Sequence, residues 1–372
     1  MKRAVSFFLT VFLALSICAQ IEWHDPMDSS EPMVCGRAWN AEIGKTYHRL
    51  PQRLQGKVPS GVWGNSMQSA GLSVRFVTDS RDVYVRYTLS NSIHGFVNMA
   101  PLNHSGVDLY AYTSDEKAHW IGNHMRWDIP QGTGDTITFK FEDISIPEGM
   151  EEVEYMLYLP PYNTVTSLQV GVTENSCFLF RPDSDEKPIV IYGSSIVQGA
   201  SPSRPGLMWT NIIGRELKRQ VINLGFSGCA LMEFSVFEVL AEIDAACFII
   251  DPIPNSYRLG EGIVDRAVEG IRYLRSKSEA PILMVEIYNS PDSIFQRTIY
   301  DRYAFANSQF RKAYELLSDE GIPHLYYLTH EEIGFSEDAM IESTHPNDIG
   351  NLEYARSYVK KLNEIFGCCI NK

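Results

Sequence analysis

The spacing of apolar residues changes about halfway along this chain of 372 residues. Between residues 21 and 182, short alternating or aromatic-rich runs recur between turn signals, which is typical of antiparallel strands. These runs include Leu72–Thr78, Asp82–Thr88, His119–Trp127, Thr136–Phe141 and Glu154–Leu159. The pattern predicts an all-β sandwich or jelly roll for the first part of the chain.

From Lys187 onward, buried apolar runs alternate with amphipathic segments, which indicates parallel strands joined by helices. The expected strands are Pro188–Gly193, Val221–Gly225, Ala246–Asp251, Ile282–Ile287 and the weaker His324–Leu328. The expected helices are Leu207–Lys218, Leu231–Glu242, Gly262–Lys277, Ile294–Glu320 and Asn347–Phe366. The second part is therefore predicted to be α/β, a doubly wound, flavodoxin-like sheet of five parallel strands with helices on both faces.

The N-terminus has the pattern of a secretory signal. A basic start is followed by the apolar run Ala4–Ile17 and by Cys18-Ala19-Gln20, which favours cleavage after Ala19. A lipid anchor at Cys18 stays open as the less favoured alternative, because isoleucine fits poorly before a lipidated cysteine. We expect a signal peptide at 1–19, a β-domain at 20–185, an α/β domain at 186–372, and a secreted or periplasmic protein.

Composition narrows the range of partners. The formal net charge is −14 and no basic patch stands out, which argues against binding to nucleic acid or to an anionic membrane. The apolar run near the N-terminus is too short to span a membrane comfortably. The cysteines show neither Cys-x-x-Cys nor zinc spacing, so we expect no metal and no cofactor. A disulfide between Cys35 and Cys177 stays open.

Several apolar runs of the second part end in residues suited to catalysis. The first ends in Gly193-Ser194-Ser195, which places a serine hydroxyl at the carboxyl end of a strand, where open α/β sheets bind ligands. A serine nucleophile needs a base, and His345 follows Glu342 by three residues far downstream. Gly228 and Asn255 follow two further apolar runs.

These elements, in this order, resemble the SGNH (GDSL-like) hydrolases. The block Gly193-Ser194-Ser195 stands where that family has Gly-Asp-Ser, and Glu342-x-x-His345 stands for its Asp-x-x-His. The segment Gly106–Tyr110 resembles the Gly-x-Asp-Leu-Tyr signature of a β-rich N-terminal domain found in one group of these esterases. A Gly-x-Ser-x-Gly elbow, expected of a different hydrolase fold, does not occur at Ser195.

The resemblance implies a role for each residue. Ser195 is the expected nucleophile, His345 its base, and Glu342 the acid that orients the imidazole. The oxyanion hole would consist of the Ser195 and Gly228 N–H groups and the Asn255 side chain. Asp338 competes with Glu342, and a Ser–His dyad without an acid is the further alternative.

Arg204 and Trp209 follow the nucleophile loop and are candidates for substrate contact, against the plainer interpretation of a salt bridge and a core aromatic. A sugar platform in the first part would consist of Trp63, His104, His119, Trp120, His124 and Trp127, although each taken singly is better explained as core or turn residue.

We therefore expect a secreted serine esterase that removes short acyl groups, acetate above all, from a carbohydrate or another small ester. A lipase or thioesterase of the same fold is the first alternative. A non-catalytic carbohydrate-binding protein is the second, and the preserved Ser195, Asn255 and His345 argue against it.

Overall fold

The computed structural model describes residues 20–123 and 134–367. The expected signal peptide, with Cys18, lies outside the described residues, as do His124, Trp127 and the end of the expected strand His119–Trp127. Among the helices of the described ranges, none combines the length and hydropathy of a membrane span.

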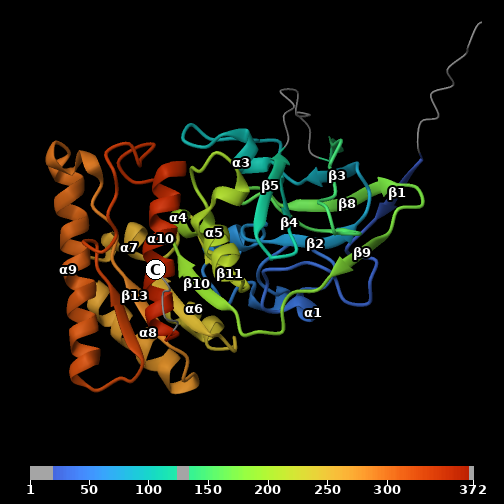
Figure 1. The fold of residues 1–372 in the computed structure, drawn as a ribbon. Helices are drawn as coiled ribbons and strands as arrows, with labels where there is room; N and C mark the ends of the chain where they lie inside the picture. Colours follow the sequence, from blue (N-terminus) through green and yellow to red (C-terminus); the bar gives the residue numbers. More distant parts are fainter. Residues whose placement is uncertain (1–19, 124–133, 368–372) are drawn as a thin grey trace, which may run out of the picture.

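The first part of the chain forms two antiparallel sheets packed face to face (Figure 1). One sheet has the order β1 (Ile21–His24), β8 (Val165–Thr173), β3 (Val83–Leu89) and β6 (Ile137–Phe141). The other has the order β5 (Ala118–Asn123), β4 (Asp108–Tyr112), β7 (Val153–Tyr158), β2 (Ser73–Thr78) and β9 (Phe178–Arg181). Alternate side chains fill the space between the sheets, as in β3, where Val83, Val85 and Tyr87 are buried. The predicted sandwich is confirmed.

Four of these strands do not correspond to a run named from the sequence: β1, β4, β8 and β9. Strand β4 contains the Asp-Leu-Tyr of the signature, and its first four residues are all buried, so it lacks the alternation that marks a half-exposed strand. The reason lies in the tertiary structure, because one face of β4 covers the sandwich core and the other faces the second domain.

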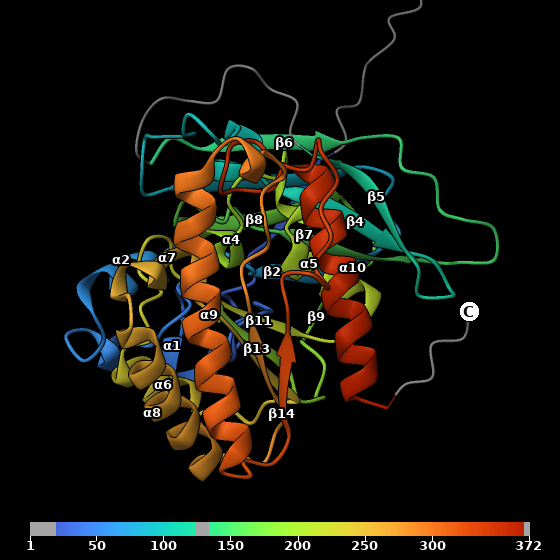
Figure 2. The same ribbon diagram turned by 90° about the vertical axis from the view of Figure 1, so that its left-hand side faces the viewer.

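The second part contains one parallel sheet with the order β11-β10-β12-β13-β14. Its strands are β10 (Ile189–Gly193), β11 (Val221–Gly225), β12 (Cys247–Asp251), β13 (Ile282–Val285) and β14 (Leu325–Leu328). The long helices are α5 (Trp209–Glu216), α6 (Phe234–Leu240), α8 (Gly262–Lys277), α9 (Arg297–Asp319) and α10 (Asp348–Ile365). Helix α5 packs against α10 on one face, while α6, α8 and α9 form the layer on the other (Figures 1 and 2). This is the predicted doubly wound sheet.

Short elements complete the chain. They are α1 (Asn40–Ile43), η1 (Gln52–Leu54), α2 (Ser60–Ser66), α3 (Pro101–Ser105), α4 (Ser195–Gln198), η2 (Pro205–Leu207), α7 (Ile253–Ser256), η3 (Tyr257–Leu259) and η4 (Pro291–Ile294).

The boundary between the two hydrophobic cores does not coincide with the boundary between the sandwich and the parallel sheet in the sequence. Leu50, Leu54, Val58 and Val62 precede every strand of the sandwich except β1, yet they belong to the hydrophobic cluster around the parallel sheet. Arg49 directly precedes this segment and its side chain is buried. Its guanidinium donates to the carbonyl oxygens of Asn223 and Gly225, among others. The expected division at residue 185/186 thus separates the sheets, while the apolar side chains of the segment 50–62 pack in the core of the α/β part.

The thiols of Cys35 and Cys177 are both free. Cys35 pairs with Ser73 at the start of β2, whereas the backbone of Cys177 lies against Thr78 at the end of that strand. The length of β2 therefore separates the two cysteines, on the order of 15 Å at ~3.3 Å per residue. A disulfide requires Cα atoms within ~7 Å, so this pair cannot form the bridge that the sequence left open.

Candidate active site

Ser195 lies at the carboxyl edge of the parallel sheet, where β10 turns directly into α4. The turn is tight because Gly193 has no side chain, and a Cβ there would lie 2.4 Å from the carbonyl oxygen of Asp251. The Ser194 hydroxyl caps the helix by accepting from the N–H of Ile196 at 3.3 Å. As a result Ser195 is the first residue of α4, and its Oγ lies 2.8 Å from Nε2 of His345.

His345 is held just before α10. The backbone of Ile341 donates to the carbonyl of His345 at 2.9 Å, and Met340 forms a bridge with Pro346. The Asn347 side chain then caps α10 by accepting from Ile349 N–H at 2.9 Å. These contacts fix the backbone on both sides of the histidine, so its ring is directed at the serine.

Glu342 completes the row of side chains. One of its carboxylate oxygens, Oε1, contacts His345 Nδ1, and the other accepts from the Thr344 N–H at 3.0 Å. With the Nδ1 proton directed at the carboxylate, Nε2 is left as the acceptor for the serine hydroxyl. Asp338 instead accepts from Asn347 Nδ2 through its backbone oxygen, at 2.6 Å, and its side chain is exposed. The structure places Glu342, rather than Asp338, at the histidine.

The electrostatics of this pair favour an ionised glutamate. Partial burial raises the pKa of Glu342, but hydrogen bonds and charge from His345 outweigh it, with smaller contributions from the Thr344 N–H and the Asn98 side chain. The net pKa of Glu342 is lowered from its ordinary value. A carboxylate that stays charged near neutral pH can stabilise an imidazolium ion.

Two loops present hydrogen-bond donors at the same edge. Strands β10, β11 and β12 end in register, Gly193 being level with Gly225 and Asp251, so the segments that follow them are neighbours. The Asn255 Oδ1 accepts from Ala230 N–H at 3.2 Å, which leaves its Nδ2 without a protein acceptor among the described residues.

Gly228 lies on the first of these loops at φ 71°, a conformation that favours glycine, and its carbonyl accepts from Arg258 at 2.6 Å. Its N–H makes no hydrogen bond within residues 20–123 and 134–367. The predicted oxyanion-hole donors Gly228 N–H and Asn255 Nδ2 thus lie on segments that neighbour the one carrying Ser195.

The two candidates for substrate contact are both engaged in interactions within the protein. Trp209 has no exposed surface, donates to the Ile196 carbonyl at 2.9 Å and packs against Tyr358. Arg204 donates to the buried carboxylate of Asp108 at 2.6 Å and joins the two domains. The fully buried indole corrects the expectation for Trp209, whereas Arg204 forms a salt bridge, which was the plainer interpretation of that residue.

The expected sugar platform does not form a single surface in the described part of the chain. His104 is fully buried and stacks edge-on with Phe96, while Trp63 packs against the core of the α/β part. Trp120 is half-exposed and donates to Asp108 at 2.8 Å. His119 is exposed. His104 and Trp63 thus serve packing in different parts of the molecule, whereas His119 and Trp120 stay exposed.

The sequence analysis missed several residues that support the site. The Tyr162 hydroxyl donates to the carbonyl oxygen of Ser195 at 3.1 Å, and Asn98 reaches His345. Asn65 donates to the carbonyl of Ser227 at 3.1 Å, beside the candidate oxyanion donor. All three come from the first part of the chain, and no local pattern marks them.

Glu286, His330 and Glu331 are the group of three potential metal ligands found among the described residues. The Glu286 carboxylate already accepts from Arg311 at 2.8 Å and from Tyr327 at 2.9 Å. A guanidinium in contact with the carboxylate opposes a cation, so we assign this group to a structural ion-pair network.

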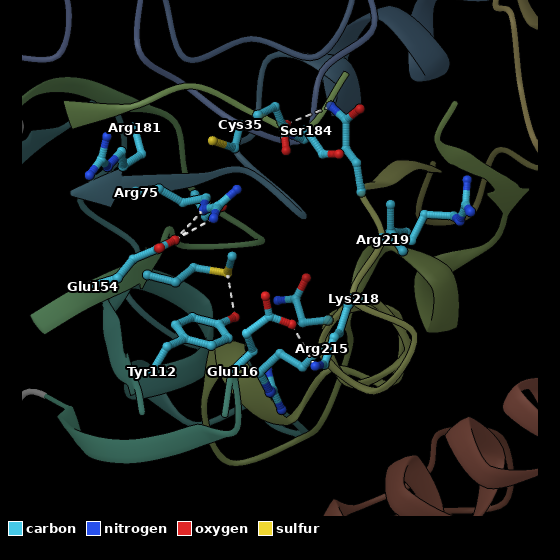
Figure 3. Close-up of a pocket in the computed structure, with 18 of the residues that line it drawn as sticks. Cys35, Arg75, Tyr112, Glu116, Glu154, Arg181, Ser184, Arg215, Lys218 and Arg219 are labelled. Atoms are coloured by element: carbon cyan, nitrogen blue, oxygen red, sulfur yellow. Dashed lines mark hydrogen bonds and ion pairs between the residues drawn. The ribbon is translucent and has the colours of Figure 1, made fainter. Parts of the chain in front are cut away.

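A cavity of about 770 Å³ lies between the domains, away from the serine (Figure 3). It reaches Val221, the first residue of β11, whereas the candidate site lies beyond the last residues of the strands. Its charged side chains are largely paired: Arg75 with Glu154, and Lys218 with Glu116 at 2.6 Å. Paired charges of both signs indicate a hydrated domain interface rather than an anion or cation site.

Comparisons with known proteins found relatives of both parts of the chain. A model of the GDSL-like lipase/acylhydrolase family matches residues 186–363, and a GxDLY model, described as the N-terminus of SGNH-hydrolase-type esterases, matches residues 21–178. The comparison with curated proteins found no match.

Solved structures share the two-domain arrangement. A protein from Bacteroides ovatus described as a GDSL-like lipase is 29% identical, with a TM-score of 0.82 over 94% of this chain and 98% of its own. The salicylyl-acyltransferase SsfX3 of a tetracycline biosynthetic pathway is 17% identical, with a TM-score of 0.69 over 95% and 99%. A family two carbohydrate esterase from Cellvibrio japonicus is 13% identical, with a TM-score of 0.57 over 94% and 99%. The last two show the fold alone.

The fold and the family matches define an esterase or acylhydrolase built on a parallel α/β sheet. More specifically, the chain belongs to the SGNH (GDSL-like) hydrolases, in the group that carries a GxDLY domain at the N-terminus.

Proposed function

We propose that this protein is a secreted or periplasmic serine esterase that hydrolyses short-chain acyl esters, acetyl esters above all, on carbohydrates. The observation that carries the proposed chemistry is the 2.8 Å contact between Ser195 Oγ and His345 Nε2. The carbohydrate part is supported by the fold shared with carbohydrate esterases, and the location by the signal-like start of the sequence.

In the proposed reaction Ser195 Oγ attacks the ester carbonyl carbon while its proton passes to His345 Nε2. The carbonyl oxygen becomes an oxyanion, which the N–H groups of Ser195 and Gly228 and the Asn255 amide would stabilise. When the intermediate collapses, His345 returns the proton to the leaving alcohol and an acyl-enzyme remains. Water then attacks the acyl carbon, with His345 as the base, and the acid and free serine are released.

Glu342 has the same role in both halves of the proposed reaction. Its contact with Nδ1 keeps the imidazole in the tautomer that accepts at Nε2, and its negative charge stabilises the imidazolium ion. The His345 side chain is 19% exposed and that of Glu342 is 42% exposed, so solvent screens part of this interaction.

One observation favours a second candidate, a lipase-like enzyme with a bulky apolar acyl group. Exposed apolar side chains lie on segments close to the histidine: Val97 next to Asn98, Ile341 within the same loop, and Phe295 just after η4. The exposed fractions of Val97 and Phe295 are 109% and 84%, so these side chains are free to contact a substrate.

A series of p-nitrophenyl esters separates the two candidates. We expect kcat/KM to fall from acetate through butyrate to octanoate, and acetate to be released from acetylated polysaccharides. The Ser195→Ala protein is the control for background hydrolysis. An octanoate ester cleaved faster than the acetate would replace the short-acyl proposal by the lipase-like one.

A further inference from the structure

Asn98 brings a side chain of the N-terminal domain into the candidate active site. It lies on the loop between β3 and α3, and its Nδ2 is 3.5 Å from Nδ1 of His345. The same amide hydrogen-bonds the Glu342 side chain. Figure 1 shows this loop of the β-domain, beside α3, reaching toward the end of the α/β part where the chain enters α10.

The loop is built to hold this position. Phe96 and Met99 exchange backbone hydrogen bonds of 3.1 and 3.0 Å, so Val97 and Asn98 form the tip of a tight turn. Met99 is buried against Tyr162 and against Ala200, which lies in the nucleophile loop, the segment that follows α4 and Ser195. The turn is thereby fixed relative to the segment that carries Ser195.

Packing and hydrogen bonds anchor the base of the turn as well. Phe96 packs edge-on against His104, with ring centroids 4.6 Å apart. Asn163 accepts from Asn91 N–H at 3.2 Å and donates to the carbonyl of the same residue at 3.0 Å. A side chain on such a turn loses little further freedom when it makes a contact, so its hydrogen bond comes at a low entropic cost.

The chemistry decides which contact of Asn98 matters. When the His345 Nδ1 carries the proton that it donates to Glu342, it cannot accept a second one, so the Asn98 N–H has only the carboxylate as acceptor. The other titratable groups facing Glu342 are the hydroxyls of Tyr288 and Tyr303, and these are bound to the backbone and side chain of Thr344.

We propose that Asn98 is a positioning residue that the N-terminal domain supplies to the Glu342–His345 pair, so that the active site is complete only when both domains are docked. This inference rests on the proposed function, in which that pair activates Ser195. The same domain also donates the Tyr162 hydroxyl to the Ser195 carbonyl, and Asn103 donates to that of Gly199 at 2.8 Å.

The test compares Asn98→Ala and Asn98→Asp with Ser92→Ala, a substitution at an exposed position of the same loop. Hydrolysis of p-nitrophenyl acetate is measured from pH 3 to 9. We expect Asn98→Ala to lower kcat about 10-fold, as for loss of a hydrogen bond to a charged group, with little change in KM. Asn98→Asp keeps the shape but replaces the donor by a carboxylate, and we expect a larger loss.

The pH profile distinguishes positioning from simple packing. Asn98 is one of the groups that lower the pKa of Glu342, so its removal raises that pKa. The acid limb of kcat/KM should therefore move to higher pH in Asn98→Ala, and further in Asn98→Asp because two carboxylates repel. In a Glu342→Gln background the Asn98→Ala substitution should cost no more than twofold, since the charged acceptor is gone.

The labelling rate of Ser195 by a serine-directed phosphonate is measured in parallel, because it reports activation of the hydroxyl without depending on the ester. Wild-type rates and an unmoved acid limb in both Asn98 variants would overturn the inference. A wild-type enzyme that labels rapidly but cleaves no ester would overturn the proposed function alone. In that case slower labelling of the Asn98 variants would still support the role of Asn98.

Discussion

Asp251, at the end of β12, makes the stability of the protein depend on pH in a direction opposite to that of most carboxylates. Its side chain is buried, and one oxygen accepts from the hydroxyls of Tyr354 at 2.6 Å and Tyr358 at 2.8 Å. The other oxygen, Oδ1, has no partner among the described residues. Burial raises the pKa of Asp251 from 3.8 to about 6, although the two tyrosines oppose the rise.

Because the folded-state pKa lies above the unfolded one, the folded protein binds more protons between these two values, and stability must fall as pH rises through that window. Each pH unit is equivalent to ~1.4 kcal/mol, so raising the pH from about 4 to above 6 costs about 3 kcal/mol. Below the lower value both states are protonated, and above the upper value both are ionised, so the contribution is constant outside the window.

The Asp251→Asn variant lacks this titration but keeps an oxygen acceptor for both tyrosines. We expect its free energy of unfolding, relative to wild type, to rise by about 3 kcal/mol between pH 4 and pH 7. Urea unfolding followed by tryptophan fluorescence is suitable, because Trp209 packs against Tyr354 with ring centroids 4.9 Å apart. Asp319→Asn, an exposed position on α9, controls for the loss of one charge.

Any cost of placing an amide nitrogen at Oδ1 is the same at every pH, so only the difference in slope is diagnostic. A stability difference between Asp251→Asn and wild type that stays constant from pH 4 to pH 7 would refute this reasoning.

The remaining predictions concern the reaction. Ser195→Ala should lower esterase kcat by ~10³-fold or more while Ser194→Ala keeps substantial activity, and the reverse result in the p-nitrophenyl acetate assay would reject Ser195 as nucleophile. Asn255→Ala should lower kcat by ~10²-fold with little change in KM, since the amide would act only once the oxyanion forms; an unchanged kcat removes it from the hole. Glu342→Gln should cost far more than Asp338→Asn, and a near-wild-type kcat for Glu342→Gln would reduce the site to a dyad. Incubation with EDTA should leave the activity unchanged, whereas a loss that zinc restores would require a metal in the mechanism.

The sequence by itself predicted the elements whose pattern is local. Strand β11 (Val221–Gly225) and helix α8 (Gly262–Lys277) have the predicted bounds, because a short apolar run and a long amphipathic repeat each contain their own signal. Ser195 and His345 could be found for a similar reason. They follow or precede regular elements at positions that an open α/β sheet always brings to one edge.

The structure alone decided which surfaces meet. A local pattern shows that a face is apolar or that a polar residue lies in a turn, but it does not show what lies opposite. Trp209 and Arg204 were therefore expected at the substrate, whereas they pack in the core and against Asp108. The core position of Leu54 depends likewise on contacts with distant parts of the chain.

The same limit explains why the sequence did not indicate a role for Asn98 in the site. It is separated from His345 by 247 positions, and only the docking of the β-sandwich against the nucleophile loop brings the two together. That docking depends on buried contacts such as Arg49 with the Gly225 carbonyl at 2.7 Å and Tyr162 with the Ser195 carbonyl at 3.1 Å. Contacts of this kind depend on the shape and polarity of the surfaces of two folded domains, so only the tertiary structure shows them.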